Sequence, residues 1–219
     1  MTSQTPYKAL PFGGCVTRDQ AVVQIIDAGK FLDSRGLAPA TSGNYSIRLS
    51  DGTIVITVSG AHKGRLISSD IMIIDSSGKP LEDKVPSAET LLHTQIYDLL
   101  PDVNAILHVH SMPGVVLTRL REEGAVMLTG YEMLKAFPGI DTHEVSISIP
   151  VVGNSQDMDV ISQSLNGKIR KGVPAYIIRD HGFYVWGKDM SEAERIAEAL
   201  EYLLSCEMEI MKIKGGGKA

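Results

Sequence analysis

The strand-like segments of this 219-residue chain most constrain its fold, because several of them are joined by very short turns. Segments 45–50 (YSIRLS) and 53–59 (TIVITVS) are separated only by an Asp-Gly pair, which is a strong hairpin signal. Segments 175–180 (AYIIRD) and 183–187 (FYVWG) flank a tight Asp-His-Gly turn. Strands connected in this way are antiparallel, since a parallel pair needs a crossover of a dozen or more residues.

Helical patterns alternate with these strand-like segments. Apolar spacing and end signals predict helices over about 17–34, 88–100, 112–124, 157–171 and 191–213, with Thr17 and Ser191 as N-caps of the first and last. Further strand-like runs lie at 71–81, 105–111, 125–128 and 145–152, whereas 130–144 has no clear pattern. We therefore expect a three-layer α/β/α fold with a mixed, largely antiparallel central sheet, rather than a doubly wound parallel sheet.

The length and the charge of the chain limit its organisation and its partners. A length of 219 residues suits a single domain, with flexible ends expected at about 1–10 and 214–219. The net charge of -5 argues against a nucleic-acid or anionic-membrane partner, because both favour basic surfaces. A phosphorylated small molecule remains compatible, since a few backbone N–H groups and one lysine can bind it.

The expected location follows from the cysteines and the apolar runs. Cys15 and Cys206 form no CxxC motif and suggest no disulfide framework. The first residues lack a basic stretch followed by an apolar core, so we expect no signal peptide. No apolar run approaches the ~18 residues that a membrane span requires. We therefore expect a cytoplasmic protein.

Two of the six histidines, His108 and His110, lie in one strand-like segment. Residues i and i+2 of a strand face the same side, so both imidazoles project together while Leu107 and Val109 face the core. This arrangement can hold a first-row metal such as zinc, whose bonds to imidazole nitrogen are about 2.0–2.1 Å long. The alternative is a pair of half-buried histidines bonded to the backbone.

A third histidine, His181, lies in the turn between two strand-like runs. Ligands concentrate on loop residues that a rigid scaffold holds in place. Three histidines with one open position are typical of catalytic zinc. A turn histidine supported by Gly182 is the alternative, because the sequence does not reveal whether His181 lies near the other two.

Two carboxylates are candidates for acid/base chemistry. Glu89 lies in PSAETLLH, in the expected first turn of a helix, where the helix dipole favours a carboxylate and Ser87 can act as a cap. Glu132 lies in GYEMLKA and reads otherwise as a solvated helix charge. Either residue can serve as a general base, and the sequence alone does not choose between them.

Two loops beside predicted strands have the composition of an anion site. They are TSGN (41–44) and VSGAHKG (58–64). Glycines let backbone N–H groups approach an anion, hydroxyls add donors, and Lys63 supplies a positive charge. Ordinary turns look the same, and neither loop matches a Walker A or dinucleotide-binding motif.

Together, TSGN, the Ser59-Gly60 pair, PSAE, HVH and the distant HG resemble the class II aldolase and adducin family over about 17–211. In the sugar-phosphate aldolases of that family, an acidic residue stands 19 positions before the first histidine of the pair, as Glu89 does before His108. The resemblance implies the fold given above, a small sugar-phosphate substrate and a homotetramer. It implies zinc on His108, His110 and His181. It also implies phosphate contacts from Gly43, Asn44, Ser59, Gly60 and Ser87, to which the loop composition adds Lys63.

One branch of the family is more similar. SAETLLHTQIY, GYEMLKA, THE, NSQD and HGFYVWG resemble its dehydratases, which remove water from 5-methylthioribulose 1-phosphate in methionine salvage. This resemblance implies Glu132 as the acid/base residue. The role of Glu89 is less defined, because the eukaryotic dehydratases carry a cysteine there. Candidates to contact an apolar methylthio tail, each of which also suits a core position, are Tyr131, Met133, Phe137 and Tyr184.

Two other functions stay open on the sequence alone. A sugar-phosphate aldolase or 4-epimerase of the same family is the main alternative, because the metal ligands do not distinguish these reactions. A non-catalytic, adducin-like binding module is the weaker alternative, since such a module does not need His-x-His and a distant His-Gly.

Overall fold

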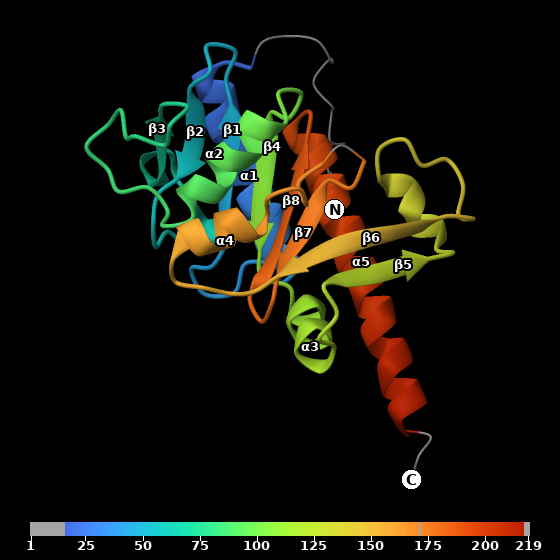
Figure 1. Cartoon of the computed structure of the whole chain (residues 1–219). Coiled ribbons are helices and arrows are strands. Elements are labelled where there is room, and N and C mark those ends of the chain that lie inside the picture. Colours follow the sequence, from blue (N-terminus) through green and yellow to red (C-terminus); the bar gives the residue numbers. More distant parts are fainter. Residues whose placement is uncertain (1–15, 171, 217–219) are drawn as a thin grey trace, which may run out of the picture.

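The structure is a computed structural model that describes residues 16–170 and 172–216. Its strands are β1 (Asn44–Arg48), β2 (Ile54–Thr57), β3 (Ile71–Ile74), β4 (Ala105–Val109), β5 (Ala125–Thr129), β6 (Ser146–Val152), β7 (Ala175–Ile178) and β8 (Gly182–Gly187). They form one sheet in the order β3-β2-β1-β4-β8-β7-β6-β5 (Figure 1). All neighbouring strands are antiparallel except β6 and β7. The predicted mixed, largely antiparallel sheet is confirmed.

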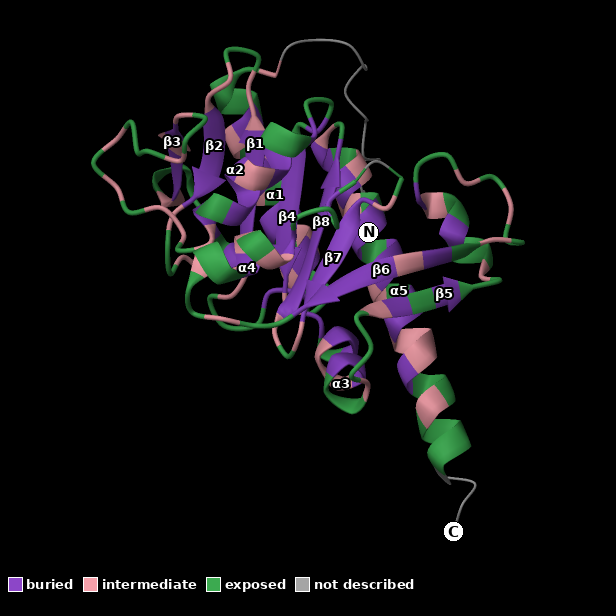
Figure 2. Ribbon diagram, in the orientation of Figure 1, coloured by how far each residue is buried: buried purple, intermediate pink, exposed green. Residues whose placement is uncertain are grey.

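Helices cover both faces of the sheet. They are α1 (Arg18–Ser34), α2 (Thr90–Leu99), α3 (Met112–Leu120), α4 (Met158–Ser164) and α5 (Met190–Gly216), with 3-10 turns η1 (Lys63–Arg65), η2 (Ser68–Asp70) and η3 (Glu132–Ala136). Along β4, Leu107 and Val109 join the core under α1, α3 and α5, whereas Ile106 joins the core under α2 and α4. Both faces of the central strands are therefore buried, as the purple β4, β7 and β8 of Figure 2 show, whereas the edge strand β5 is partly exposed. The three-layer architecture is confirmed.

The predicted N-cap of the first helix is confirmed, and the predicted N-cap of the last helix is not. Thr17 caps α1 in a capping box with Gln20, as the N-cap preference predicts. Ser191 as the cap of α5 is wrong. The carboxylate of Asp189 accepts the backbone N–H of Glu192 at 2.8 Å, and Ser191 lies inside the helix. Aspartate and serine are both good N-caps, so the sequence did not distinguish these two positions.

Two helices are shorter than predicted. Helix α3 ends at Leu120 because the carbonyls of Arg121 and Glu123 accept from the Arg179 guanidinium instead of continuing the helix. Helix α4 ends at Ser164, three residues before Gly167, which has a φ of 73° in the left-handed region. Its predicted end at 171 lies outside the described residues.

The described part of the C-terminal helix extends past the core. The expected flexible segment 1–10 and Cys15 lie outside the described residues, and α5 continues to Gly216, past the expected start of the second flexible end. The last turns of α5 extend beyond the sheet, and Ile213 is 75% exposed there (Figure 1). Of the helices in the described ranges, none is long and apolar enough to cross a membrane.

Candidate metal centre and active site

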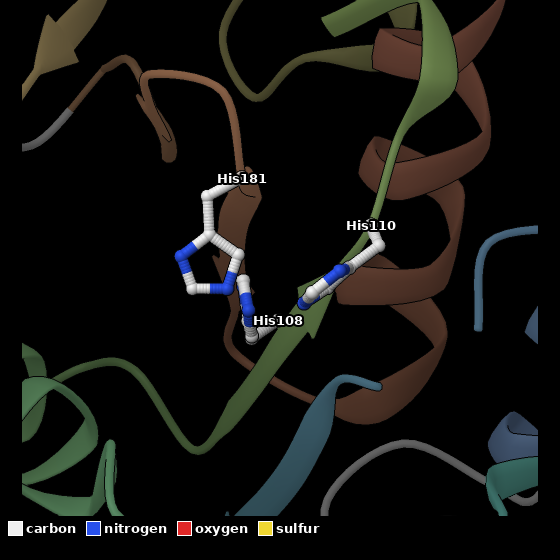
Figure 3. Close-up of side chains that lie close together, drawn as sticks. All are labelled: His108, His110 and His181. Atoms are coloured by element: carbon white, nitrogen blue, oxygen red, sulfur yellow. The ribbon is translucent and has the colours of Figure 1, made fainter. Parts of the chain in front are cut away.

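Strand pairing brings the three predicted metal ligands together. His108 lies in β4, His110 follows the end of β4, and His181 lies in the turn that leads into β8. Because β4 pairs with β8, this turn lies beside His108 and His110. One ring nitrogen of each histidine lies within 4.8 Å of the others, and Figure 3 shows the three rings converging on one point.

The protonation of these imidazoles suits a metal. The Nδ1 atom of His108 lies 3.1 Å from the Phe183 carbonyl oxygen, to which it donates, so Nε2 is the unprotonated nitrogen. This Nε2 atom is buried and has no hydrogen-bond partner among the described residues. Burial lowers the pKa of His108 to about 4 and the pKa of His110 to about 3. Both rings are therefore neutral at neutral pH, as metal ligands must be, and the donor set fits a divalent metal.

Two glycines permit the close approach of the site's elements. A Cβ atom on Gly182 would lie 2.2 Å from the Val109 carbonyl oxygen, so only glycine lets β8 start this close to β4. Gly43 has a φ of 80°, and a Cβ atom there would lie 2.7 Å from the His108 carbonyl oxygen. Gly182 of the HG pair and Gly43 of TSGN therefore allow the backbone to pack closely beside the predicted metal ligands.

Glu89 lies among the histidines of the site and is not merely a carboxylate favoured by the dipole in the first turn of a helix. It stands just before α2, at the N-cap position, and its side chain makes no capping hydrogen bond. Its carboxylate oxygens lie 3.2 Å from His108 Nε2 and 3.4 Å from His181 Nε2. The side chains of Asn44 and Tyr184 each donate to it at 2.8 Å.

These contacts set the charge of Glu89. Burial raises the pKa of this carboxyl, but His108 and the hydrogen bond from Asn44, together with His181 and Tyr184, lower it by more. The net pKa lies below the usual value for glutamate. The site therefore contains an ionised carboxylate, held by Asn44 and Tyr184, beside the rings of His108 and His181.

A polar cavity of about 330 Å³ opens beside Glu89 and His110. It lies between the loops 41–44 and 58–64 and the segment leading into α2. All six residues predicted to bind substrate line it: Gly43, Asn44, Ser59, Gly60, Lys63 and Ser87. Thr41, Val58 and Ala88, which the sequence did not single out, line it as well. Its volume suits a small phosphorylated ligand.

Lys63 takes part in this cavity differently from the way that the sequence suggested. The side chain is buried, and its ammonium donates to the carbonyl oxygens of Thr41 at 2.9 Å and Ala61 at 2.6 Å. Burial lowers the pKa of Lys63 to about 8. The bond to Thr41 therefore ties the loop 58–64 to the loop 41–44, and the bond to Ala61 stays within its own loop.

Glu132 does not join the histidines within the described chain. It lies in η3 with its side chain 70% exposed, and pairs with Lys135 at 2.6 Å and His143 at 3.6 Å. The hydrogen bond from Lys135 lowers the pKa of its carboxyl.

The four residues predicted to contact an apolar methylthio tail lie in different surroundings. Tyr184 is fully buried and bonded to Glu89, and Phe137 belongs to the core. Tyr131 donates to Glu207, and Met133, at 40% exposure, lines a second cavity beside α5. The bond of Tyr184 to Glu89 is a feature that sequence reasoning missed, because the pairing of β4 with β8 creates it.

Three converging histidines, a fixed carboxylate and a polar cavity on an α/β/α sheet together form a possible metal site of the kind found in enzymes. The family model described as "Class II Aldolase and Adducin N-terminal domain" matches residues 23–208. The chain belongs to the class II aldolase and adducin family.

Relatives with curated names are similar over nearly their full length. The methylthioribulose-1-phosphate dehydratase of Methylococcus capsulatus is 51% identical over 193 residues, covering 87% of this chain and 94% of the relative. The enzyme of the same name from Hahella chejuensis is 48% identical over 195 residues, with the same coverage.

Solved structures share the fold at lower identity. YgbL from Klebsiella pneumoniae has a TM-score of 0.76 at 27% identity, over 87% of this chain and 89% of that one. The L-fuculose-1-phosphate aldolase from Thermus thermophilus has a TM-score of 0.75 at 23% identity, over 92% of this chain and 100% of that one. The likeness to the aldolase establishes the fold alone.

Proposed function

We propose that this chain is a hydro-lyase that removes water from 5-methylthioribulose 1-phosphate and yields 5-methylthio-2,3-dioxopentyl phosphate in methionine salvage. The observation that carries the proposal is the agreement with dehydratases at 45–51% identity over nearly their whole length. An aldolase or 4-epimerase is less well supported, since the aldolase with a solved structure described above is only 23% identical.

We propose zinc as the metal, held by His108, His110 and His181. The convergence of the three imidazoles and the unpartnered Nε2 atom of His108 support this ligand set. When bound, zinc supplies a Lewis acid that polarises the substrate oxygens. A set of three histidine ligands matches zinc better than the oxygen-preferring cations.

The phosphate is proposed to occupy the polar cavity. Backbone N–H groups of the loops at Gly43 and Gly60 and the hydroxyls of Ser59 and Ser87 are available as donors. The N-terminus of α2 adds a favourable dipole, and the buried charge of Lys63 adds a favourable field from behind the loops.

The reaction requires loss of a proton from C3 and of hydroxide from C4, followed by tautomerisation of the enol to the diketone. Glu132 is proposed to take the C3 proton and to return it to the departing C4 hydroxyl, which leaves as water. Because Glu132 is exposed and, among the described residues, pairs with the surface groups Lys135 and His143, we propose that it reaches the site of a neighbouring copy in a homotetramer. We further propose that this assembly works in the cytoplasm.

Direct assay of the reaction tests the proposed function. The zinc-loaded protein is incubated with 5-methylthioribulose 1-phosphate, with L-fuculose 1-phosphate as the control substrate. We expect diketone formation from the first substrate and no cleavage of the second. Cleavage of L-fuculose 1-phosphate without any diketone would favour the aldolase instead.

Mixing two inactive variants tests the position of Glu132. Glu132→Gln lowers turnover by ~10²–10⁴-fold if this carboxylate is the acid/base group, and zinc content stays normal. Glu132→Gln and His108→Ala subunits are then unfolded together and reassembled. Recovered activity supports transfer between subunits, whereas a mixture as inactive as its parts contradicts it.

A further inference from the structure

A chain of buried hydrogen bonds runs from the core to the active-site carboxylate. The Tyr97 hydroxyl lies 2.9 Å from Ser46 Oγ, and Ser46 Oγ lies 2.7 Å from Nδ1 of His93. Nε2 of His93 contacts Oδ1 of Asn44, and Nδ2 of Asn44 lies 2.8 Å from Glu89. His93 and Ser46 are fully buried, and Asn44 and Tyr97 are at most 4% exposed.

The sequence positions explain how this chain of bonds forms. Asn44 and Ser46 are two residues apart on β1 and therefore face the same side of the sheet. Glu89 and His93 are four residues apart at the start of α2, so they lie on one face of the helix. When α2 packs on the sheet, the ring of His93 bridges the two β1 side chains. The register opposes Asn44 to His108, which places its amide beside the metal ligands.

The direction of the bonds follows from the orientation of the Asn44 amide. Its Nδ2 donates to Oε2 of Glu89, so its oxygen faces Nε2 of His93. His93 must then donate from Nε2. Burial lowers the pKa of His93 to about 3, so the ring is neutral and its Nδ1 accepts from the Ser46 hydroxyl. The Tyr97 hydroxyl donates to Ser46, which leaves each polar group satisfied.

We propose that His93 is a positioning residue: its Nε2–H fixes the orientation of the Asn44 amide, which holds the Glu89 carboxylate beside the metal histidines. This inference rests on the proposed function and on the position of Glu89 beside the proposed metal ligands His108 and His181. Without the His93 donor, the Asn44 amide is free to reverse and to turn its oxygen toward Glu89. The carboxylate then keeps only the donor from Tyr184 and loses a defined orientation.

The tautomer of His93 is a direct test that needs no assay of turnover. The full-length, zinc-loaded protein is labelled with ¹⁵N in its histidine rings, and the signal of His93 is assigned by its loss in a variant. We expect a neutral ring protonated on Nε2 at pH 7. A ring protonated on Nδ1, or on both nitrogens, would overturn the proposed direction of the chain.

Substitutions then test the positioning role. His93→Gln keeps an N–H donor near the place of Nε2, and we expect kcat within about threefold of wild type. His93→Met removes that donor, and we expect kcat to fall about tenfold or more, as for a hydrogen bond to a charged group, with KM and zinc content unchanged. Tyr176→Phe is the control, because this buried hydroxyl has no hydrogen-bond partner among the described residues; we expect wild-type kcat.

The outcomes separate this inference from the proposed function. If Glu89→Gln keeps wild-type turnover, the assignment of Glu89 to the active site fails. If Glu89→Gln is inactive but folded His93→Met keeps wild-type kcat, only the role of His93 fails. If His93→Met does not fold, the tautomer of the wild-type protein and the activity of His93→Gln decide, and an inactive, folded, zinc-loaded His93→Gln overturns the inference.

Discussion

The contact between Gly182 and β4 predicts that one added methyl group disrupts the metal centre. In Gly182→Ala, the new Cβ atom would lie 2.2 Å from the Val109 carbonyl oxygen, although ordinary contact begins at 3.4 Å. Val109 stands between two metal histidines, and the third precedes Gly182. Relief of the clash requires the two strands to separate by about 1.2 Å, whereas metal–ligand distances tolerate about 0.2 Å.

The expected losses follow from that displacement. Zinc affinity should fall by about 10–100-fold, the range seen when groups supporting metal ligands are disturbed. The free energy of unfolding of the metal-free protein should fall by about 1–3 kcal/mol, as in overpacked interiors. Alanine restricts the unfolded chain more than glycine, but that gain of about 0.4–1 kcal/mol is smaller.

Competition with a chelator measures the zinc affinity of Gly182→Ala, and denaturant unfolding measures its stability. Gly153→Ala is the matched control, because no atom lies within 4 Å of its added Cβ and its φ lies outside the left-handed region. We expect the control to retain zinc affinity and stability. Wild-type zinc affinity in Gly182→Ala would refute the reasoning that the His-Gly pair positions the third ligand.

Three further predictions concern the metal ligands, Lys63 in the phosphate loops and Glu194 in helix α5. Replacing His110 or His181 with alanine should abolish zinc binding and turnover together, as judged by metal analysis, and full zinc occupancy in either variant contradicts the ligand set. Lys63→Met should weaken inhibition by inorganic phosphate by about tenfold or more, as for loss of hydrogen bonds from a charged group, and an unchanged inhibition constant would exclude Lys63 from the anion site. Burial, with Asp27 and Glu198 nearby, raises the pKa of Glu194 to about 7 from 4.5, so the folded state binds the extra proton between these values and stability falls as pH rises. Glu194→Gln should therefore raise the free energy of unfolding at pH 8 by about 1–2 kcal/mol, after allowance for partial exposure, and the gain should vanish below pH 4.5.

The fold was predictable where short turns and local periodicity decide it. The Asp-Gly hairpin between β1 and β2 and the turn between β7 and β8 form as expected. The parallel pairing of β6 with β7 was not predictable, because it depends on contacts between segments far apart in the chain. The length of α3 was not predictable for the same reason, since a distant arginine, Arg179, binds the carbonyls that follow it.

In the candidate site, too, features set by local sequence were predictable, and contacts between distant segments were not. Strand periodicity predicts that His108 and His110 face one side, and the loop composition points to the residues that line the cavity. The hydrogen bonds from Lys63 to two backbone carbonyls could not be predicted from the sequence of a glycine-rich loop. The bridge from His93 to β1 leaves a signal in the spacing of Glu89 and His93, but the pairing with Asn44 needs the packed sheet.

The pairing of β4 with β8 also has a consequence for the order of folding. His108 and His181 are 73 positions apart in the chain, and they meet only where these two strands pair. Closing a loop of that length carries an entropy cost before any contact in the site can form. The proposed zinc site is therefore incomplete until the two halves of the sheet have joined. The rate at which a refolding chain captures zinc should report the closure of the central sheet rather than the formation of its helices.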